Sequence, residues 1–182
     1  MTESIAAADL ISALVRAGAT HVIGLPDNTS AALFDRAEAH DGITVLTVTR
    51  EGEAFAVASG LWLGGKNPVV VVQNTGLLES GDSLRGTAVR MGVPLLCIVT
   101  YRGYSSMIAH AAESEGNSPG IETLTRNDVD SVALATEPTL RAWGIPYHVY
   151  SGDAKPGALI DAWQEAHREQ RPVAVLLTQS PA

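Results

Sequence analysis

Two glutamates that stand close together, Glu51 and Glu53, follow directly after a short β-branched run. A positioned carboxylate can hold or transfer a proton, so either residue is a candidate for general acid–base chemistry. Taken alone, a glutamate at this place is more often a solvated residue at the start of a helix, where the helix dipole favours negative charge. The choice between a catalytic and a solvated glutamate therefore depends on the surrounding sequence.

Further polar residues follow other predicted strands. In chain order they are Pro26, Asp27 and Asn28, then Gln73, Asn74 and Thr75, and finally Arg102. Ligands of open α/β sheets bind outside the carboxyl ends of the strands, which makes these residues candidates for a site. Each group also has an ordinary interpretation as turn, cap or solvated surface residues.

An anionic substrate group would need a charge-assisted hydrogen-bond donor, and Arg102 is a better candidate than Arg50 or Arg85. His110 could also reach a substrate, because it lies in the polar, weakly periodic segment 103–127. We expect that segment to be a mobile loop near a site or a partner. The histidines show no metal-ligand spacing, so no zinc site is predicted.

A regular alternation of helices and strands positions these candidates. Strands are predicted over residues 21–26, 43–48, 68–73, 94–100 and 173–178, and helices over 4–17, 30–40, 54–63, 80–90, 131–143 and 156–169. Strands that are apolar throughout are typical of a parallel sheet covered on both faces. The pattern predicts one three-layer α/β/α domain over residues 1–182, with a mostly parallel sheet.

The composition narrows the class of protein. The 182 residues are 46% hydrophobic, which suits a single domain with a substantial core. A net charge of -8 without a dense basic run is not the pattern of a nucleic-acid binder. The single cysteine, Cys97, lies in an apolar run and is expected to be a small buried residue. No leader or membrane span is apparent, so we expect no membrane association and a cytoplasmic location.

The candidate residues belong to motifs that resemble the pyrimidine-binding domain of thiamine-diphosphate-dependent decarboxylases. The matching segments are residues 24–28, 49–54, 58–60, 73–77 and 93–96, and the resemblance covers nearly the whole chain. In that family a glutamate after the second strand engages the aminopyrimidine ring of the cofactor, nine residues before a helix glycine. Glu51 and Gly60 have this spacing, which makes Glu53 the less favoured carboxylate.

Among these enzymes, the sulfopyruvate and phosphonopyruvate decarboxylases are the most similar. Segments 50–54, 73–77, 101–103 and 143–147 carry this closer resemblance. In the sulfopyruvate enzymes the two halves are separate subunits. The Gly-Asp-Gly stretch and asparagine that hold magnesium in the other half have no counterpart here, since 81–83 and 152–154 lack the pairing. The resemblance therefore implies an α subunit that needs a diphosphate-domain (β) subunit, most simply as α2β2.

The resemblance also implies a role for each candidate. The cofactors would be thiamine diphosphate and Mg²⁺, with the metal ligands on the partner, and the substrate a small 2-oxo acid. The implied residues are Glu51 for catalysis, Pro26, Asp27, Asn28, Gln73 and Thr75 beside Glu51 for cofactor binding, and Asn74, Arg102 and His110 for substrate binding. A partner that covers the neighbourhood of Phe55 and Val57 would desolvate Glu51 and favour its protonated form.

Two other functions remain compatible with the sequence. The same cofactor chemistry could form carbon–carbon bonds, as in relatives of acetohydroxyacid synthase. Alternatively, the fold could serve as a non-catalytic binding module. Gly52 stands where the sulfur- and phosphonate-specific enzymes often have a bulkier or acidic residue, which bears on the substrate rather than the cofactor.

Overall fold

The computed structural model describes residues 6–113, 127–128, 130–151 and 156–182, without the side chains of 110–113. Its centre is a six-stranded sheet in the order β2-β1-β3-β4-β6-β5, and every strand pair is parallel. The strands are β1 His21–Gly24, β2 Thr44–Thr47, β3 Pro68–Gln73, β4 Leu96–Thr100, β5 Tyr147–Tyr150 and β6 Val173–Leu177. This arrangement confirms the predicted fold class.

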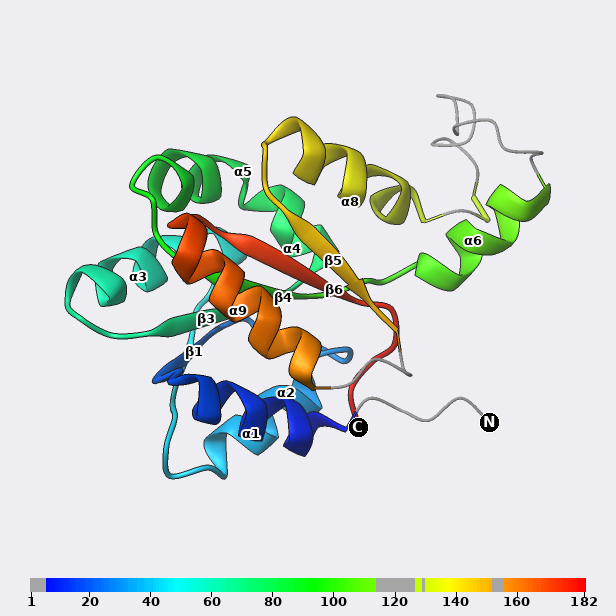
Figure 1. The fold of residues 1–182 in the computed structure, drawn as a ribbon. Helices are drawn as coiled ribbons and strands as arrows, with labels where there is room; N and C mark the ends of the chain where they lie inside the picture. Colours follow the sequence, from blue (N-terminus) through cyan, green and yellow to red (C-terminus); the bar gives the residue numbers. More distant parts are fainter. Residues whose placement is uncertain (1–5, 114–126, 129, 152–155) are drawn as a thin grey trace.

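Helices cover both faces of the sheet (Figure 1). They are α1 Ala7–Ala17, α2 Ala31–Glu38, α3 Glu51–Leu63, α4 Asn74–Glu79, α5 Gly81–Ser83, the π-helix η1 Leu84–Val89, α6 Tyr104–Glu113, α8 Ser131–Ala142 and α9 Gly157–Glu169. One buried core joins α1, α2 and α9 to the sheet. A second core joins α3, η1 and α8 to the opposite face.

Strand β3 shows why an apolar run predicts two covered faces. Val69 and Val71 belong to the core beneath α1, α2 and α9, whereas Val70 and Val72 belong to the other core. All four valines are fully buried, because successive side chains of a strand point to opposite faces. Cys97 on β4 is buried as expected, and this burial raises the pKa of its thiol. In the described residues, no helix combines the length and apolar character needed to span a membrane.

Helix α3 begins at Glu51, three residues before its predicted start. The side chain of Glu53 accepts hydrogen bonds from the backbone amides of Thr49, at 3.0 Å, and Arg50, at 3.2 Å. These bonds satisfy amides that the first turn of a helix leaves without partners. Glu51 therefore occupies the first position of the helix rather than a loop before it.

The helix predicted over 80–90 is wrong in its extent, because the connection from β3 to β4 contains three short helices. Asn74 already begins α4, so residues 73–76 form the end of a strand and the start of a helix rather than a loop or turn. The hydroxyl of Ser80 donates to the Gly76 carbonyl at 2.5 Å, and that of Thr87 donates to the Ser83 carbonyl. Hydroxyls that bond back to the helix backbone compete with its regular hydrogen bonds, which fits the breaks here.

Two further regions differ from expectation. Residues 104–113 of the predicted loop form α6, which begins after Gly103 at a φ of +82°, while residues 114–126 lie outside the described part. Strand β5 was not predicted. In the described residues it pairs only with β6, at the edge of the sheet, and it exposes His148 and Val149. An exposed edge strand lacks the continuous apolar run by which the buried strands were predicted.

Candidate active site

Parallel strands bring the predicted site residues to one edge of the sheet. Asp27 follows β1, Glu51 follows β2, Gln73 ends β3, and Arg102 follows β4. Because all strands run in the same direction, their carboxyl ends share this edge. The sequence prediction of a common site region therefore agrees with the topology.

Glu51 lies half-buried in the first turn of α3, against Gly76 of α4. Val57 on the same helix is 38% exposed and Leu63 is 66% exposed, whereas Phe55 is fully buried in the core. Within the described residues, the Glu51 carboxylate has no hydrogen-bond partner. A half-buried carboxylate without such a partner is a suitable acceptor for a donor on a bound molecule.

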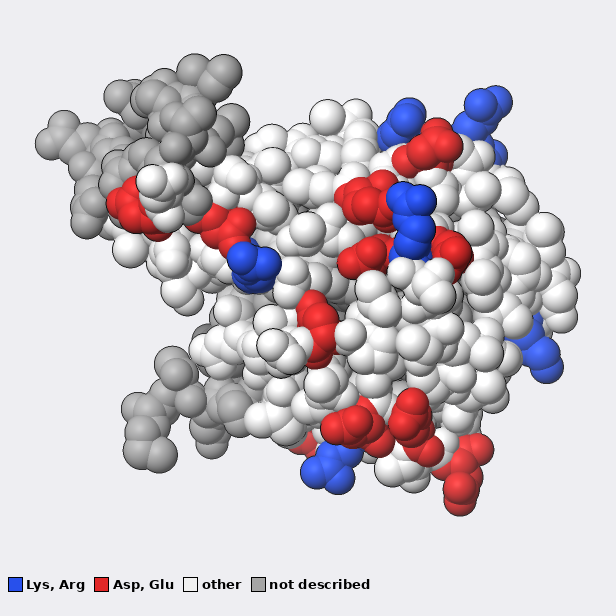
Figure 2. Space-filling model, turned by 180° about the vertical axis from the view of Figure 1, so that it is seen from behind, with Lys and Arg blue, Asp and Glu red and all other residues white. Residues whose placement is uncertain are grey.

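The two neighbouring carboxylates are already engaged. Besides the two backbone amides, Glu53 accepts a hydrogen bond from the hydroxyl of Thr49 at 2.9 Å, and bonds from Thr49 and Arg50 lower the pKa of Glu53. Glu79 forms an ion pair with Arg50, which raises the pKa of that guanidinium, and also accepts from the Gly52 amide at 3.1 Å. The geometry thus favours Glu51 over Glu53, as the sequence did. Figure 2 shows acidic and basic side chains side by side on the upper part of the rear face.

Asp27 is the centre of a polar network across the ends of β1, β3 and β4. Its Oδ1 accepts from the backbone amides of Thr29, at 2.9 Å, and Ser30, at 2.8 Å, and also from both hydroxyls. Its Oδ2 accepts from Nε2 of Gln73 at 2.7 Å. The hydroxyls of Thr29 and Thr100 lie 2.7 Å apart. This network fixes the loop after β1 to the central strands.

The other cofactor-binding candidates lie around this network. Thr75 is exposed and donates to Oε1 of Gln73 at 3.1 Å. Pro26 and Asn28 flank Asp27, and both are exposed. The structure therefore brings Asp27, Gln73 and Thr75 into one hydrogen-bonded chain and leaves Pro26 and Asn28 open to a ligand or a partner.

Asn74 is placed differently from its neighbours. Its side chain is fully buried, and its Nδ2 donates to the Arg102 carbonyl at 3.0 Å and to the Thr136 hydroxyl at 3.2 Å. Asn74 thereby joins the start of α4 to the loop after β4 and to α8. These contacts support a structural role for Asn74.

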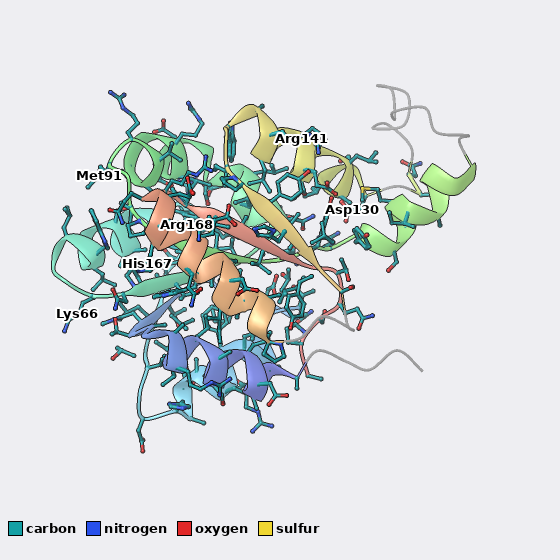
Figure 3. The ribbon with its side chains drawn as sticks, in the orientation of Figure 1. Lys66, Met91, Asp130, Arg141, His167 and Arg168 are labelled. Carbon is teal, nitrogen blue, oxygen red and sulfur yellow. The ribbon has the colours of Figure 1, made fainter. Side chains whose placement is uncertain are left out.

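Arg102 lines a small cavity between the ends of β4 and β6 and the start of α6, which we call the β4–β6 pocket. Its volume is about 250 Å³, and its polar lining includes Thr29, Arg102, Ser105, Ser106, Thr178 and Gln179. The Arg102 side chain is 59% exposed, and its guanidinium pairs with Asp130 at 3.0 Å. Figure 3 shows Asp130 at the end of α8 that lies nearest α6. His110 belongs to α6, but its side chain lies outside the described part.

Helix α8 is tied to the same strand end by a second set of hydrogen bonds. The hydroxyl of Tyr101 donates to the Ala133 carbonyl at 3.0 Å and to Glu137 at 3.2 Å, and burial followed by the Glu137 charge raises the pKa of Tyr101. Tyr147 also donates to Glu137, at 2.8 Å. Polar contacts to α8, in addition to packing, therefore stabilise the end of β4 next to Arg102.

Sequence reasoning missed several residues that the fold brings into the site. Thr29 and Thr100 complete the Asp27 network although 71 residues separate them, and Glu79 contacts Arg50 across 29 residues. Contacts between residues so far apart in the sequence leave no pattern in the local sequence around either residue. Gly76 was included in the motif 73–77 without a role of its own, although a glycine directly after Gln73-Asn74-Thr75 could have indicated a close approach at a strand end.

The described residues contain no group of three or more His, Cys, Asp or Glu side chains that could hold a metal ion. The Glu51 carboxylate fits one part of thiamine diphosphate, the aminopyrimidine ring, which offers nitrogen atoms for hydrogen bonding.

Comparison with known proteins agrees with this geometry. The family model described as "Thiamine pyrophosphate enzyme, N-terminal TPP binding domain" matches residues 5–135. Among solved structures, 2-oxoglutarate:ferredoxin oxidoreductase from Magnetococcus marinus superposes with a TM-score of 0.65 and 18% identity, covering 97% of this chain and 29% of that one. At this identity the superposition supports the fold alone.

Curated relatives match shorter stretches. Phosphonopyruvate decarboxylase of Streptomyces viridochromogenes is 39% identical over 99 residues, which is 54% of this chain and 25% of that protein. Sulfopyruvate decarboxylase subunit alpha of Methanothermobacter thermautotrophicus is 29% identical over 104 residues, 57% of this chain and 63% of that subunit. The match therefore spans less than two thirds of either relative.

Proposed function

Because the chain belongs to the thiamine pyrophosphate enzymes and matches their N-terminal binding domain, we propose that it is the α subunit of a thiamine-diphosphate-dependent 2-oxo acid decarboxylase. The names of the relatives favour sulfopyruvate or phosphonopyruvate as the kind of substrate. The observation that carries the proposal is the Glu51 carboxylate. It is half-buried at the expected position and, among the described residues, has no hydrogen-bond partner.

Glu51 would act on the aminopyrimidine ring of the cofactor. Its carboxylate would hold a proton shared with a ring nitrogen, which promotes loss of the proton from the thiazolium C2. When bound, the cofactor supplies the electron sink for decarboxylation. Gln73, Thr75 and Asp27 would line the ring side of the site, with Pro26 and Asn28 at its exposed rim.

A partner subunit would complete the site. Val57 and Leu63 expose apolar surface on the helix that begins with Glu51, and such surface suits contact with a partner. A partner that also covers the start of this helix would remove water from the Glu51 carboxylate. We place the Mg²⁺ ligands and the diphosphate site on that diphosphate-domain (β) subunit. An α2β2 hetero-oligomer is the simplest closed assembly.

The substrate's second anionic group would bind in the β4–β6 pocket. Arg102 offers a charged donor, and Ser105 and Ser106 offer hydroxyls that bond to no described residue. Asp130 lies against the same guanidinium, so the anion would share Arg102 with this carboxylate. His110 stands on α6, a helix that borders the pocket, and Asn74 would act on substrate only indirectly, through the Arg102 backbone.

The direct test is reconstitution with a subunit that carries the Gly-Asp-Gly and asparagine motif. We expect carbon dioxide release from sulfopyruvate or phosphonopyruvate, dependent on thiamine diphosphate and Mg²⁺, and much slower release from pyruvate. Formation of a carbon–carbon bond in place of net decarboxylation would point to a carboligase. A complex without either activity would contradict the proposal.

A further inference from the structure

The contact between Glu51 and Gly76 leaves no room for a side chain at position 76. A methyl group there would lie 2.3 Å from Cγ of Glu51 and 2.6 Å from its Oε1. Both distances are far shorter than any ordinary contact between heavy atoms. Glu51 can hold its observed conformation only while residue 76 is glycine.

Backbone conformation does not explain this glycine. Gly76 lies inside α4 and is not among the glycines with positive φ. Inside a helix glycine is less favourable than alanine, because it loses more conformational freedom on folding. The space occupied by the Glu51 side chain is therefore the physical reason for glycine at this position.

One turn further along α4, Glu79 holds the residues on either side of Glu51. One of its carboxylate oxygens pairs with Arg50, and the other accepts from the Gly52 amide at 3.1 Å. A methyl group at Gly52 would lie 3.3 Å from the same Glu79 oxygen, which gives a structural reason for a small residue after Glu51. Helix α4 thus contacts three consecutive residues at the start of α3.

Helix α4 is itself anchored at its start. Buried Asn74 bonds its first turn to the loop after β4 and to α8. We propose that α4 is the element that positions the Glu51 carboxylate, with Gly76 and Glu79 as its positioning residues. This inference rests on the proposed catalytic role of Glu51.

A double-mutant cycle in the isolated chain tests the contact without any need for activity. Gly76→Ala should lower the melting temperature when Glu51 is present and should no longer do so in a Glu51→Ala background, where the clashing atoms are gone. Gly157→Ala is the matched control, because nothing lies within 4 Å of an added methyl there, and its effect should be equal in both backgrounds. An equal loss for Gly76→Ala in both backgrounds would overturn the contact.

Kinetics of the reconstituted complex test positioning itself. We expect Gly76→Ala to reduce kcat about 100-fold, the cost of a misplaced catalytic group, with KM for the 2-oxo acid little changed. Glu79→Gln should reduce kcat by a smaller factor, and Gly157→Ala should leave it unchanged. Wild-type kcat in Gly76→Ala would overturn the positioning role. An inactive wild-type complex would instead overturn the proposed function, and the thermal cycle would still decide whether Glu51 and Gly76 are coupled.

Discussion

The two sides of the sheet differ in how much apolar surface their helices leave exposed. Helices α1, α2 and α9 pack their apolar faces into one core, and Glu165 on α9 pairs with His148 of β5 at 2.6 Å. Figure 3 shows His167 and Arg168 on α9, well away from Asp130. Helix α3 instead begins with a carboxylate that has no hydrogen-bond partner in the described chain, and it exposes Val57 and, at its end, Leu63. Among the described residues, the large exposed apolar side chains include two on α3 and none on α1, α2 or α9.

The largest effect should come from Glu51. Glu51→Gln keeps the size of the side chain but removes its ionisable group, so turnover of the reconstituted complex should fall by about 100-fold or more. Its melting temperature and its assembly with the partner should stay unchanged, because the described residues give this carboxylate no hydrogen bond to lose. Glu38→Gln, at an exposed position of α2, is the control. Wild-type turnover in Glu51→Gln would refute the catalytic assignment.

The same substitution on the two sides should have opposite consequences. Leu14→Ala removes a buried side chain of α1 and should lower the free energy of unfolding by about 2–5 kcal/mol. Turnover per folded molecule should be retained. Urea denaturation of the isolated chain, followed by assay of the complex, measures both quantities.

Leu63→Ala is the counterpart on α3. Because Leu63 is 66% exposed, the free energy of unfolding of the isolated chain should change by about 0.5 kcal/mol or less. Affinity for the diphosphate-domain subunit should fall, as measured by titration calorimetry. Unchanged affinity would remove Leu63 from the proposed partner surface and weaken the contrast between the two sides.

Arg102 should affect substrate binding rather than chemistry. Loss of a charge-assisted hydrogen bond in Arg102→Gln should raise KM for sulfopyruvate or phosphonopyruvate about tenfold, with a smaller change in kcat. Pyruvate, which lacks the second anionic group, should be used equally by mutant and wild type. Arg168→Gln on α9 controls for the lost surface charge. If Arg102→Gln and wild type had equal KM values for the anionic substrate, its second anionic group would bind away from Arg102.

The smallest effect concerns Glu53 and its dependence on pH. Hydrogen bonds from Thr49 lower the pKa of Glu53 below its ordinary value of 4.5, so the ionised form stabilises the folded chain. This stability is fully present above pH 4.5 and is lost as the pH falls through the lowered value. Glu53→Gln should therefore reduce the melting temperature by a few degrees at neutral pH, and the gap should narrow below pH 4.5. A gap that is constant with pH would contradict the capping role.

Local pattern was sufficient for most of the fold. The apolar run 68–72 predicted a strand covered on both faces, and Gly18 marks the end of α1 with a φ of +94°. The breaks among α4, α5 and η1 were not predictable, since they coincide with individual hydroxyl bonds such as that of Ser80. Strand β5 was missed because its place at the sheet edge leaves side chains exposed.

The candidate site was predictable only in part. The resemblance identified Glu51 and the loops after β1, β3 and β4, and parallel topology then explains their common edge. It could not distinguish Asn74, which is buried against Thr136, from Thr75, which is exposed beside Gln73. Nor could it reveal that Glu79 and Gly76 contact the start of α3, because such contacts depend on how two helices pack.

The most direct test of the account is calorimetric titration of thiamine diphosphate with Mg²⁺ into this chain, alone and in complex with the diphosphate-domain subunit. The account predicts tight binding only in the complex, weakened by Glu51→Gln, because each chain supplies part of the site. Equally tight binding to the isolated chain, or no binding to the complex, would contradict the claim that this domain is one half of a shared active site.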